Sequence, residues 1–173
     1  IGALYKASTV NDSAALTRYY KAMECFEKAE LHERQMSTHL SIATMLFILD
    51  SSDKAVPHLE KALSMAEALH DTLNMLSAYS LYAFKEQNTG KLAQIARRAE
   101  QLYEEISVPS LIEEDIINSI NYCGVELFMN AGIQDSALLF LNCIRMRDEV
   151  DATILSWQGF TKRKTTRKKR QNA

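Results

Sequence analysis

The chain has 173 residues, of which 47% are hydrophobic and 24% are charged. This composition is that of an ordinary soluble protein, and the length fits one domain or one stretch of a repeat array. The longest apolar runs, such as MLFIL at 45–49, are far shorter than the roughly 20 residues that span a bilayer. We therefore expect a cytoplasmic protein without a transmembrane segment.

The net charge of −2 hides a basic C-terminal segment, because residues 161–173 contain no acidic residue. Residues 1–160 hold 13 Lys and Arg against 22 Asp and Glu, a net charge of −9. A basic segment could bind nucleic acid or another anionic surface, direct nuclear import, pack on the acidic body, or be a soluble end without fixed structure. Its cations are Lys162, Arg163, Lys164, Arg167, Lys168, Lys169 and Arg170.

Apolar residues recur at intervals of three and four along most of the chain, which predicts an all-α protein. The first expected helix follows the N-cap candidates at 11–13 and runs to about Leu31. Short loops join the expected helices into hairpins. The hairpins cover about 1–31, 33–69, 71–106 and 110–149, with a short terminal helix at 150–160.

Glycine and proline mark the expected turns. Gly90, in the sequence NTG at 88–90, is expected to be a left-handed turn residue. Pro109 cannot continue a helix and disfavours helical geometry in the residue before it, so SVPS at 107–110 predicts a break. The sequence AGI at 131–133 predicts the turn before the last long helix.

One spacing recurs: a small residue, a large one four later, and a small one three after that. It occurs first at Ala22, Phe26 and Ala29, and again exactly 33 residues later at Ala55, Leu59 and Ala62. Small residues let neighbouring helices approach closely, while the large residue fills the gap between them. Looser copies follow at Leu92, Ala96 and Ala99, and at Ala137, Leu141 and Ile144.

This pattern resembles the tetratricopeptide repeat, a 34-residue helix-turn-helix unit. The resemblance covers nearly all of 12–149 and implies antiparallel hairpins stacked in a right-handed superhelix. It implies a non-catalytic scaffold that binds a protein or peptide on its concave wall, as a segment of a longer protein. The alternative is a peptide-sensing regulatory segment of a bacterial transcriptional regulator or signalling protein.

In such repeats the first helix of each pair lines the concave wall. Counting from Ala43, Ser80 and Gly124 as the small sites, the lining combines hydroxyl and amide groups with apolar side chains. Asn118 and Asn121 lie on one helical face and could clamp one peptide unit; such residues could equally cover a solvated groove or a neighbouring helix. The candidate binding residues are Thr44, Phe47, Asn74, Ser77, Leu81, Asn118, Asn121 and Phe128.

The sequence predicts no catalytic residue, metal site or cofactor. The four histidines lie 7, 19 and 12 residues apart and offer no close metal-binding pair in sequence. Three cysteines form no CxxC pair, which predicts reduced thiols buried as small hydrophobic residues. They are Cys25, Cys123 and Cys143.

Overall fold

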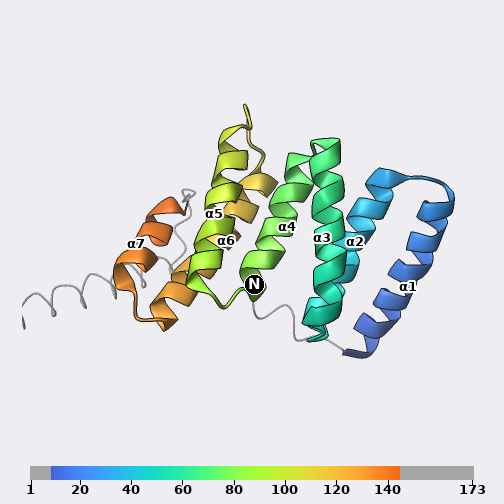
Figure 1. The fold of residues 1–173 in the computed structure, drawn as a ribbon, viewed down its shortest axis with the longest axis horizontal. Helices are drawn as coiled ribbons and strands as arrows, with labels where there is room; N and C mark the ends of the chain where they lie inside the picture. Colours follow the sequence, from blue (N-terminus) through green and yellow to red (C-terminus); the bar gives the residue numbers. More distant parts are fainter. Residues whose placement is uncertain (1–8, 145–173) are drawn as a thin grey trace, which may run out of the picture. The chain divides into compact units, whose positions relative to one another are not determined.

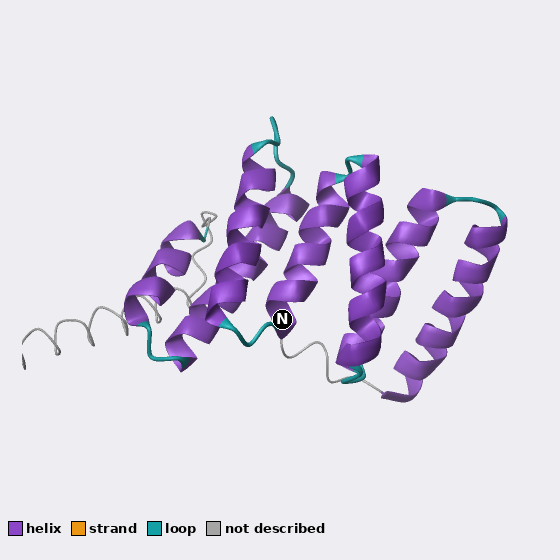
Figure 2. Cartoon of the chain, viewed as in Figure 1, coloured by secondary structure: helices purple, strands orange, loops and turns teal. Residues whose placement is uncertain are grey.

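The structure, a computed structural model, describes residues 9–144, with side chains from residue 13 on. This range contains seven helices and no strand (Figures 1 and 2), which confirms the all-α prediction. No helix in it is long and apolar enough to cross a membrane. The helices are α1 (Thr9–Lys28), α2 (His32–Ile48), α3 (Ser52–Leu69), α4 (Thr72–Lys85), α5 (Thr89–Glu104), α6 (Leu111–Asn130) and α7 (Gln134–Cys143). The expected helix at 150–160 and the basic segment 161–173 lie outside the described residues.

The chain divides into two compact units, Ile1–Lys85 and Glu86–Ala173. In the first unit α2 packs against α1, α3 and α4, and α3 also packs against α4. In the second unit α6 packs against both α5 and α7. The boundary between the units falls between the two helices that the sequence predicts as the 71–106 hairpin.

The repeated small-large-small positions are buried in three of their four copies, so these residues pack the helices as expected. The exception is α1, where Ala22 and Phe26 are half-buried and Ala29 is exposed. The expectation for Ala29 is wrong because α1 ends at Lys28 and Ala29 already belongs to the turn. The buried copies are Ala55, Leu59 and Ala62; Leu92, Ala96 and Ala99; and Ala137, Leu141 and Ile144.

Gly124 allows a close approach between α6 and α7. A methyl group added at Gly124 would meet the ring of Phe140, with Cγ at 2.5 Å and Cε1 at 2.6 Å. That ring stacks on Phe128 of α6, with centroids 5.3 Å apart. The absence of a side chain at Gly124 therefore makes room for this aromatic pair.

Four helices end in the same kind of left-handed turn. Glu30, Asp50 and His70 have φ of 54°, 57° and 52°, and Gly132 has φ of 74°. In each turn the following N–H donates to the carbonyl five residues earlier, which satisfies a carbonyl at the helix end. These bonds are Leu31 to Phe26 (3.0 Å), Ser51 to Leu46 (2.8 Å), Asp71 to Ala66 (2.9 Å) and Ile133 to Phe128 (2.9 Å).

Gly90 does not form the expected left-handed turn. It lies in the first turn of α5, and the cap before it is Asn88, whose side chain accepts a hydrogen bond from Lys91 N at 2.9 Å. The residues at 11–13 also do not cap a helix, because α1 already includes Thr9. The break at SVPS is confirmed, since Ser110 and Glu113 form a capping box that starts α6.

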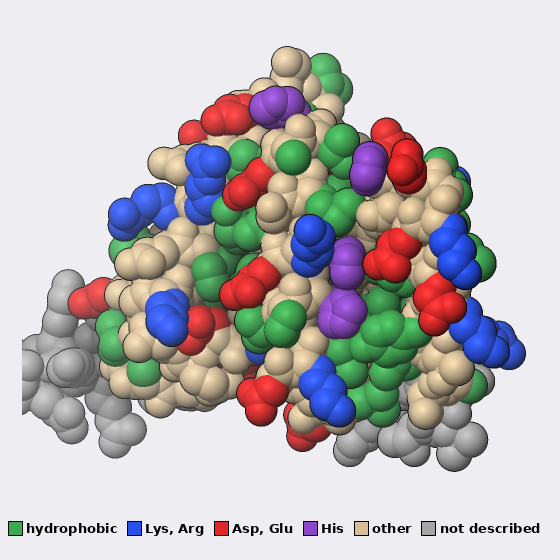
Figure 3. Space-filling model, turned by 45° about the vertical axis from the view of Figure 1, so that its right-hand side comes forward, with side chains coloured by type: hydrophobic (Ala, Val, Ile, Leu, Met, Phe, Trp, Pro, Cys, Tyr) green, Lys and Arg blue, Asp and Glu red, His purple; other side chains and the backbone are tan. Residues whose placement is uncertain are grey.

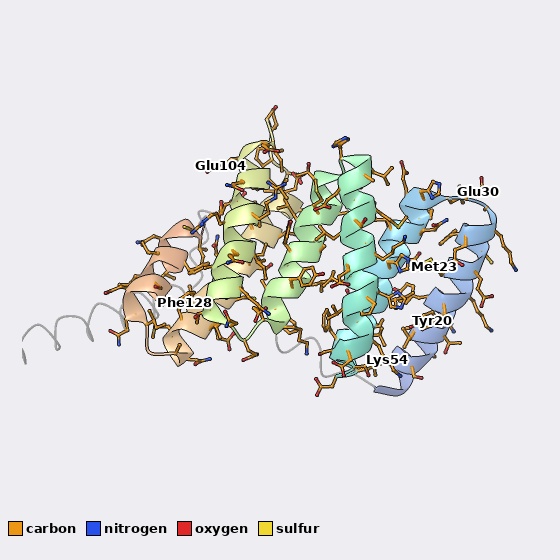
Figure 4. All side chains as sticks on the ribbon, viewed as in Figure 1. Tyr20, Met23, Glu30, Lys54, Glu104 and Phe128 are labelled. Carbon is orange, nitrogen blue, oxygen red and sulfur yellow. The ribbon has the colours of Figure 1, made fainter. Side chains whose placement is uncertain are left out.

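Glu30→Gly is expected to stabilise the protein by about 0.5–1 kcal/mol, because glycine adopts positive φ without the strain of a Cβ atom. Glu30 is exposed in the α1–α2 turn (Figure 4). Glu24→Gly, at an exposed position inside α1, is the matched control and should destabilise by about 1 kcal/mol. Urea unfolding of both variants measures the two changes in the free energy of unfolding. If both variants are destabilised, or both stabilised, the left-handed turn at Glu30 is contradicted.

Candidate functional site

Four of the predicted binding residues belong to two helices of the first unit that pack against each other: Thr44 and Phe47 to α2, and Ser77 and Leu81 to α4. Ser77, Leu81 and Phe84 follow the spacing of one side of α4. We call Thr44, Ser77, Leu81, Phe84 and Lys85 the α2–α4 face. Phe47 lies beneath it and is buried, so its ring supports the face and is not open to a partner.

The hydroxyl groups of the α2–α4 face already use their hydrogen atoms. Thr44 Oγ1 donates to the Leu40 carbonyl and Ser77 Oγ donates to the Leu73 carbonyl, each at 2.8 Å. A hydroxyl has one donor and two acceptor positions. The two oxygens can therefore still accept hydrogen bonds from N–H groups of a partner, and they lie on exposed or part-buried surface.

Phe84 supplies the apolar surface of this face. Its side chain is 58% exposed, whereas Leu81 is half-buried against the core of the first unit. Burial of a phenylalanine side chain contributes about 1.5–3 kcal/mol. Phe84 thus offers a partner more apolar surface than any other side chain of the α2–α4 face.

Lys85 is a residue of this face that the sequence did not indicate. Its Nζ lies 5.8 Å from the centroid of the Phe47 ring and 5.5 Å from that of Phe84. Asp50 Oδ1 lies 3.7 Å from the same Nζ. Lys85 follows Phe84 directly in the sequence, and a lysine next to an aromatic residue was the available signal. These contacts place a positive charge at one end of the face.

Asn74 has a local structural role. Its backbone N–H donates to Asp71 Oδ1 at 3.0 Å, and its Nδ2 donates to Asp71 Oδ2 at 2.7 Å. Asp71 precedes α4 and satisfies an N–H of its first turn. The Asn74 amide is therefore held at the start of α4 rather than directed toward a partner.

The three predicted residues of the second unit do not form an open amide clamp. Asn121 is 2% exposed, and its Nδ2 donates to Glu100 Oε1 of α5 at 3.0 Å. Phe128 is also buried, under Phe140. Asn118 is half-buried. The physical reason is that α5 and α7 cover this part of α6, so Asn121 joins helices instead of facing solvent.

The structure brings together two histidines that the sequence spacing kept apart. His39 of α2 and His58 of α3 have their Nδ1 atoms 2.9 Å apart, and their ring centroids lie 5.1 Å apart. Tyr20 of α1 places its hydroxyl oxygen 3.4 Å from His58 Nε2. Tyr20 lies on the side of α1 that faces α2 and α3 (Figure 4). His39 and His58 are 19 residues apart in the sequence, and the packing of α2 against α3 brings their rings together.

Burial lowers the pKa of His39 from 6.5 to about 4, with further lowering by the nearby charges of His58 and Lys61. Burial also lowers the pKa of His58. Both rings are therefore neutral at pH 7. The Nδ1–H of one ring then donates a hydrogen bond to the Nδ1 of the other across the 2.9 Å separation.

His39 is expected to make stability depend on pH between about 6.5 and 4. Because its folded pKa is lower, the unfolded chain binds the proton more tightly, so stability falls as pH drops through this window. Thermal unfolding is measured across this pH range with a chelator present. The melting temperature should fall less steeply with decreasing pH for His39→Gln than for the parent chain. His32→Gln, at an exposed histidine of α2, should retain the parent slope; equal slopes for His39→Gln and the parent would contradict this effect.

The three cysteines differ in their exposure. None of the three, all within the described residues, forms a disulfide. Cys25 and Cys143 are exposed, so the expected burial is wrong for both, because they lie on outward faces of α1 and α7. Cys123 is half-buried, and burial together with Glu126 raises its thiol pKa to about 11. Its thiolate is therefore scarce at neutral pH.

A second exposed apolar area lies where α5 joins α6. Val108 is 86% exposed, and Leu111 and Ile112 are also well exposed. Exposed glutamates, Glu104 and Glu105, precede it in the chain. Residues 107–112 contain no aromatic side chain, so this short apolar tip has no counterpart of the Phe84–Lys85 contact and is the less specific of the two surfaces.

Comparison with protein-family models, curated proteins and solved structures found no match to this chain. The geometry of the described residues therefore supplies the basis for a functional proposal.

Proposed function

We propose that the chain is a non-catalytic scaffold of tetratricopeptide-like hairpins that binds an extended peptide segment of a protein partner on the α2–α4 face. The observation that carries this proposal is the exposed Phe84 ring on the same side of α4 as Ser77, whose hydroxyl oxygen, like that of Thr44, remains a hydrogen-bond acceptor. The repeated left-handed turns and buried small residues support the repeat-like architecture.

The chemistry of this face defines the partner. Oxygens of Thr44 and Ser77 would accept hydrogen bonds from backbone N–H groups of an extended segment. An apolar side chain of that segment would cover Phe84. Lys85, near the same ring, would favour an acidic group at one end of the segment, since Asp50 pairs with it only at a highly exposed position.

A comparative capture experiment tests this proposal. The immobilised 173-residue chain is incubated with a lysate of the source cells beside two variants, Ser77→Arg and Ser64→Arg. Ser77 belongs to the α2–α4 face, whereas Ser64 is exposed on α3. The added bulk and charge at residue 77 should displace the partner, and the same change at residue 64 should not.

We expect at least one protein that the parent chain and Ser64→Arg retain and that Ser77→Arg and Phe84→Ser lose. Ile112→Ser, at the separate apolar tip, should retain it as well. If all variants capture the same proteins in the same amounts while remaining folded by circular dichroism, the α2–α4 face is not the binding surface.

A further inference from the structure

The His39–His58 pair lies apart from the α2–α4 face. The rings come from two neighbouring helices and are each half-buried, with their Nδ1 atoms 2.9 Å apart. Figure 3 shows two histidine side chains in contact at the surface beside an area of hydrophobic side chains. One side of each ring is thus open to solvent while the other packs on the protein.

Two nitrogen atoms at this separation cannot both carry hydrogen, because the two N–H bonds would then point at each other. In the neutral pair one Nδ1 carries the hydrogen atom and the other Nδ1 accepts the hydrogen bond from it. If the proton of the first ring moves to its own Nε2, both Nδ1 lone pairs become available in one place. No proton leaves the pair in this tautomer change, so its net charge stays the same.

Tyr20 can accept a hydrogen bond from the tautomer of His58 that a metal ion requires. When His58 Nδ1 carries no hydrogen, its Nε2 carries one and can donate to the Tyr20 oxygen at 3.4 Å. A metal-binding histidine is commonly oriented through its other ring nitrogen in this way. The rings of Tyr20 and His58 also meet edge-on, with centroids 5.7 Å apart, and this contact holds the His58 ring in place.

We propose that His39 and His58 form a two-histidine site for a divalent transition-metal ion, of the class of Zn²⁺, Ni²⁺ and Cu²⁺. Imidazole nitrogen is a favoured ligand of these ions. Tetrahedral Zn²⁺ with Zn–N bonds of about 2.05 Å places two nitrogen atoms roughly 3.4 Å apart, so the rings need to separate by about half an ångström. Water completes the coordination, since no group of three or more His, Cys, Asp or Glu side chains among the described residues is placed to hold a metal ion.

Lys61 opposes cation binding. It lies three residues after His58 on α3, and its charge acts on His39. A neutral residue there should strengthen metal binding, whereas removal of the Tyr20 hydroxyl should weaken it. These two substitutions leave both histidines intact and change affinity in opposite directions.

Isothermal titration of the full 173-residue chain with NiCl₂ tests the site. We expect one saturable site whose affinity falls at least tenfold in His39→Asn and in His58→Asn. Lys61→Gln should bind several-fold more tightly and Tyr20→Phe several-fold more weakly. His32→Asn and His70→Asn, at exposed histidines, should bind like the parent.

Nickel binding that is unchanged in the His39→Asn, His58→Asn double variant would overturn the proposal, as would the absence of saturable binding in the parent chain. If the histidine variants lose their helical circular dichroism, the Lys61→Gln and Tyr20→Phe affinities decide. No change in either of them, or changes of the same sign, would also overturn it.

Discussion

Ala62→Trp is expected to lower the free energy of unfolding by about 3 kcal/mol, because the indole has no room in a close helix contact. Ala62 is 1% exposed on α3, and it belongs to the same core cluster as Leu59 and Ala43. Urea or thermal unfolding followed by circular dichroism measures this loss.

Ala29→Trp is the matched control, since Ala29 holds the same position in the first copy of the spacing, 33 residues earlier. Ala29 is exposed after the end of α1, so its substitution should change stability by less than about 0.5 kcal/mol. Similar losses of stability in both variants would show that Ala29 is buried as the sequence pattern predicted, and would contradict its exposed position after the end of α1.

Gly124→Val is expected to destabilise the second unit by about 2–3 kcal/mol, because its side chain would overlap the Phe140 ring. Glu126→Val, at an exposed position of α6, controls for the helix preference of valine and should cost under about 1 kcal/mol. Unfolding followed by a probe in the second unit measures both variants.

A double-mutant cycle identifies the cause of this loss. Phe140→Ala removes the ring that Gly124→Val would meet, so the double variant should be more stable than the sum of the two single effects predicts, by at least about 1 kcal/mol. If the two single effects simply add, the side chain at residue 124 does not meet the Phe140 ring. That result would contradict the assigned role of Gly124.

The packing of the helices could be predicted because it depends on local periodicity. Ala55, Leu59 and Ala62 lie on one side of a helix whatever their neighbours are, and that side became buried. The burial of Ala29 could not be predicted in the same way, because it depends on where α1 ends. The helix end is set by the turn at Glu30, which no sequence signal marked.

The turns were the least predictable part of the fold. Glycine was expected at left-handed positions, yet Glu30, Asp50 and His70 occupy three of the four. The backbone hydrogen bond that closes each turn outweighs the strain of a side chain at positive φ. Gly90, conversely, lies at a helix start where glycine is not required.

The candidate site was predicted in part. Thr44 and Ser77 lie on accessible surface as the helical spacing indicated, but Asn121 is buried because α5 covers it. Which side of a helix stays open depends on its neighbours, and spacing along one helix does not contain that information. The His39–His58 contact likewise follows from the antiparallel packing of α2 and α3, which pairs residues on either side of the turn at Asp50.

The most direct test of the proposed function is a binding titration with the protein that the capture experiment recovers. Calorimetry compares its affinity for the parent chain, Ser77→Arg and Ser64→Arg. We predict that Ser77→Arg weakens binding at least tenfold, about 1.4 kcal/mol, while Ser64→Arg stays within twofold of the parent. Equal affinities for the parent and a folded Ser77→Arg variant would contradict binding on the α2–α4 face.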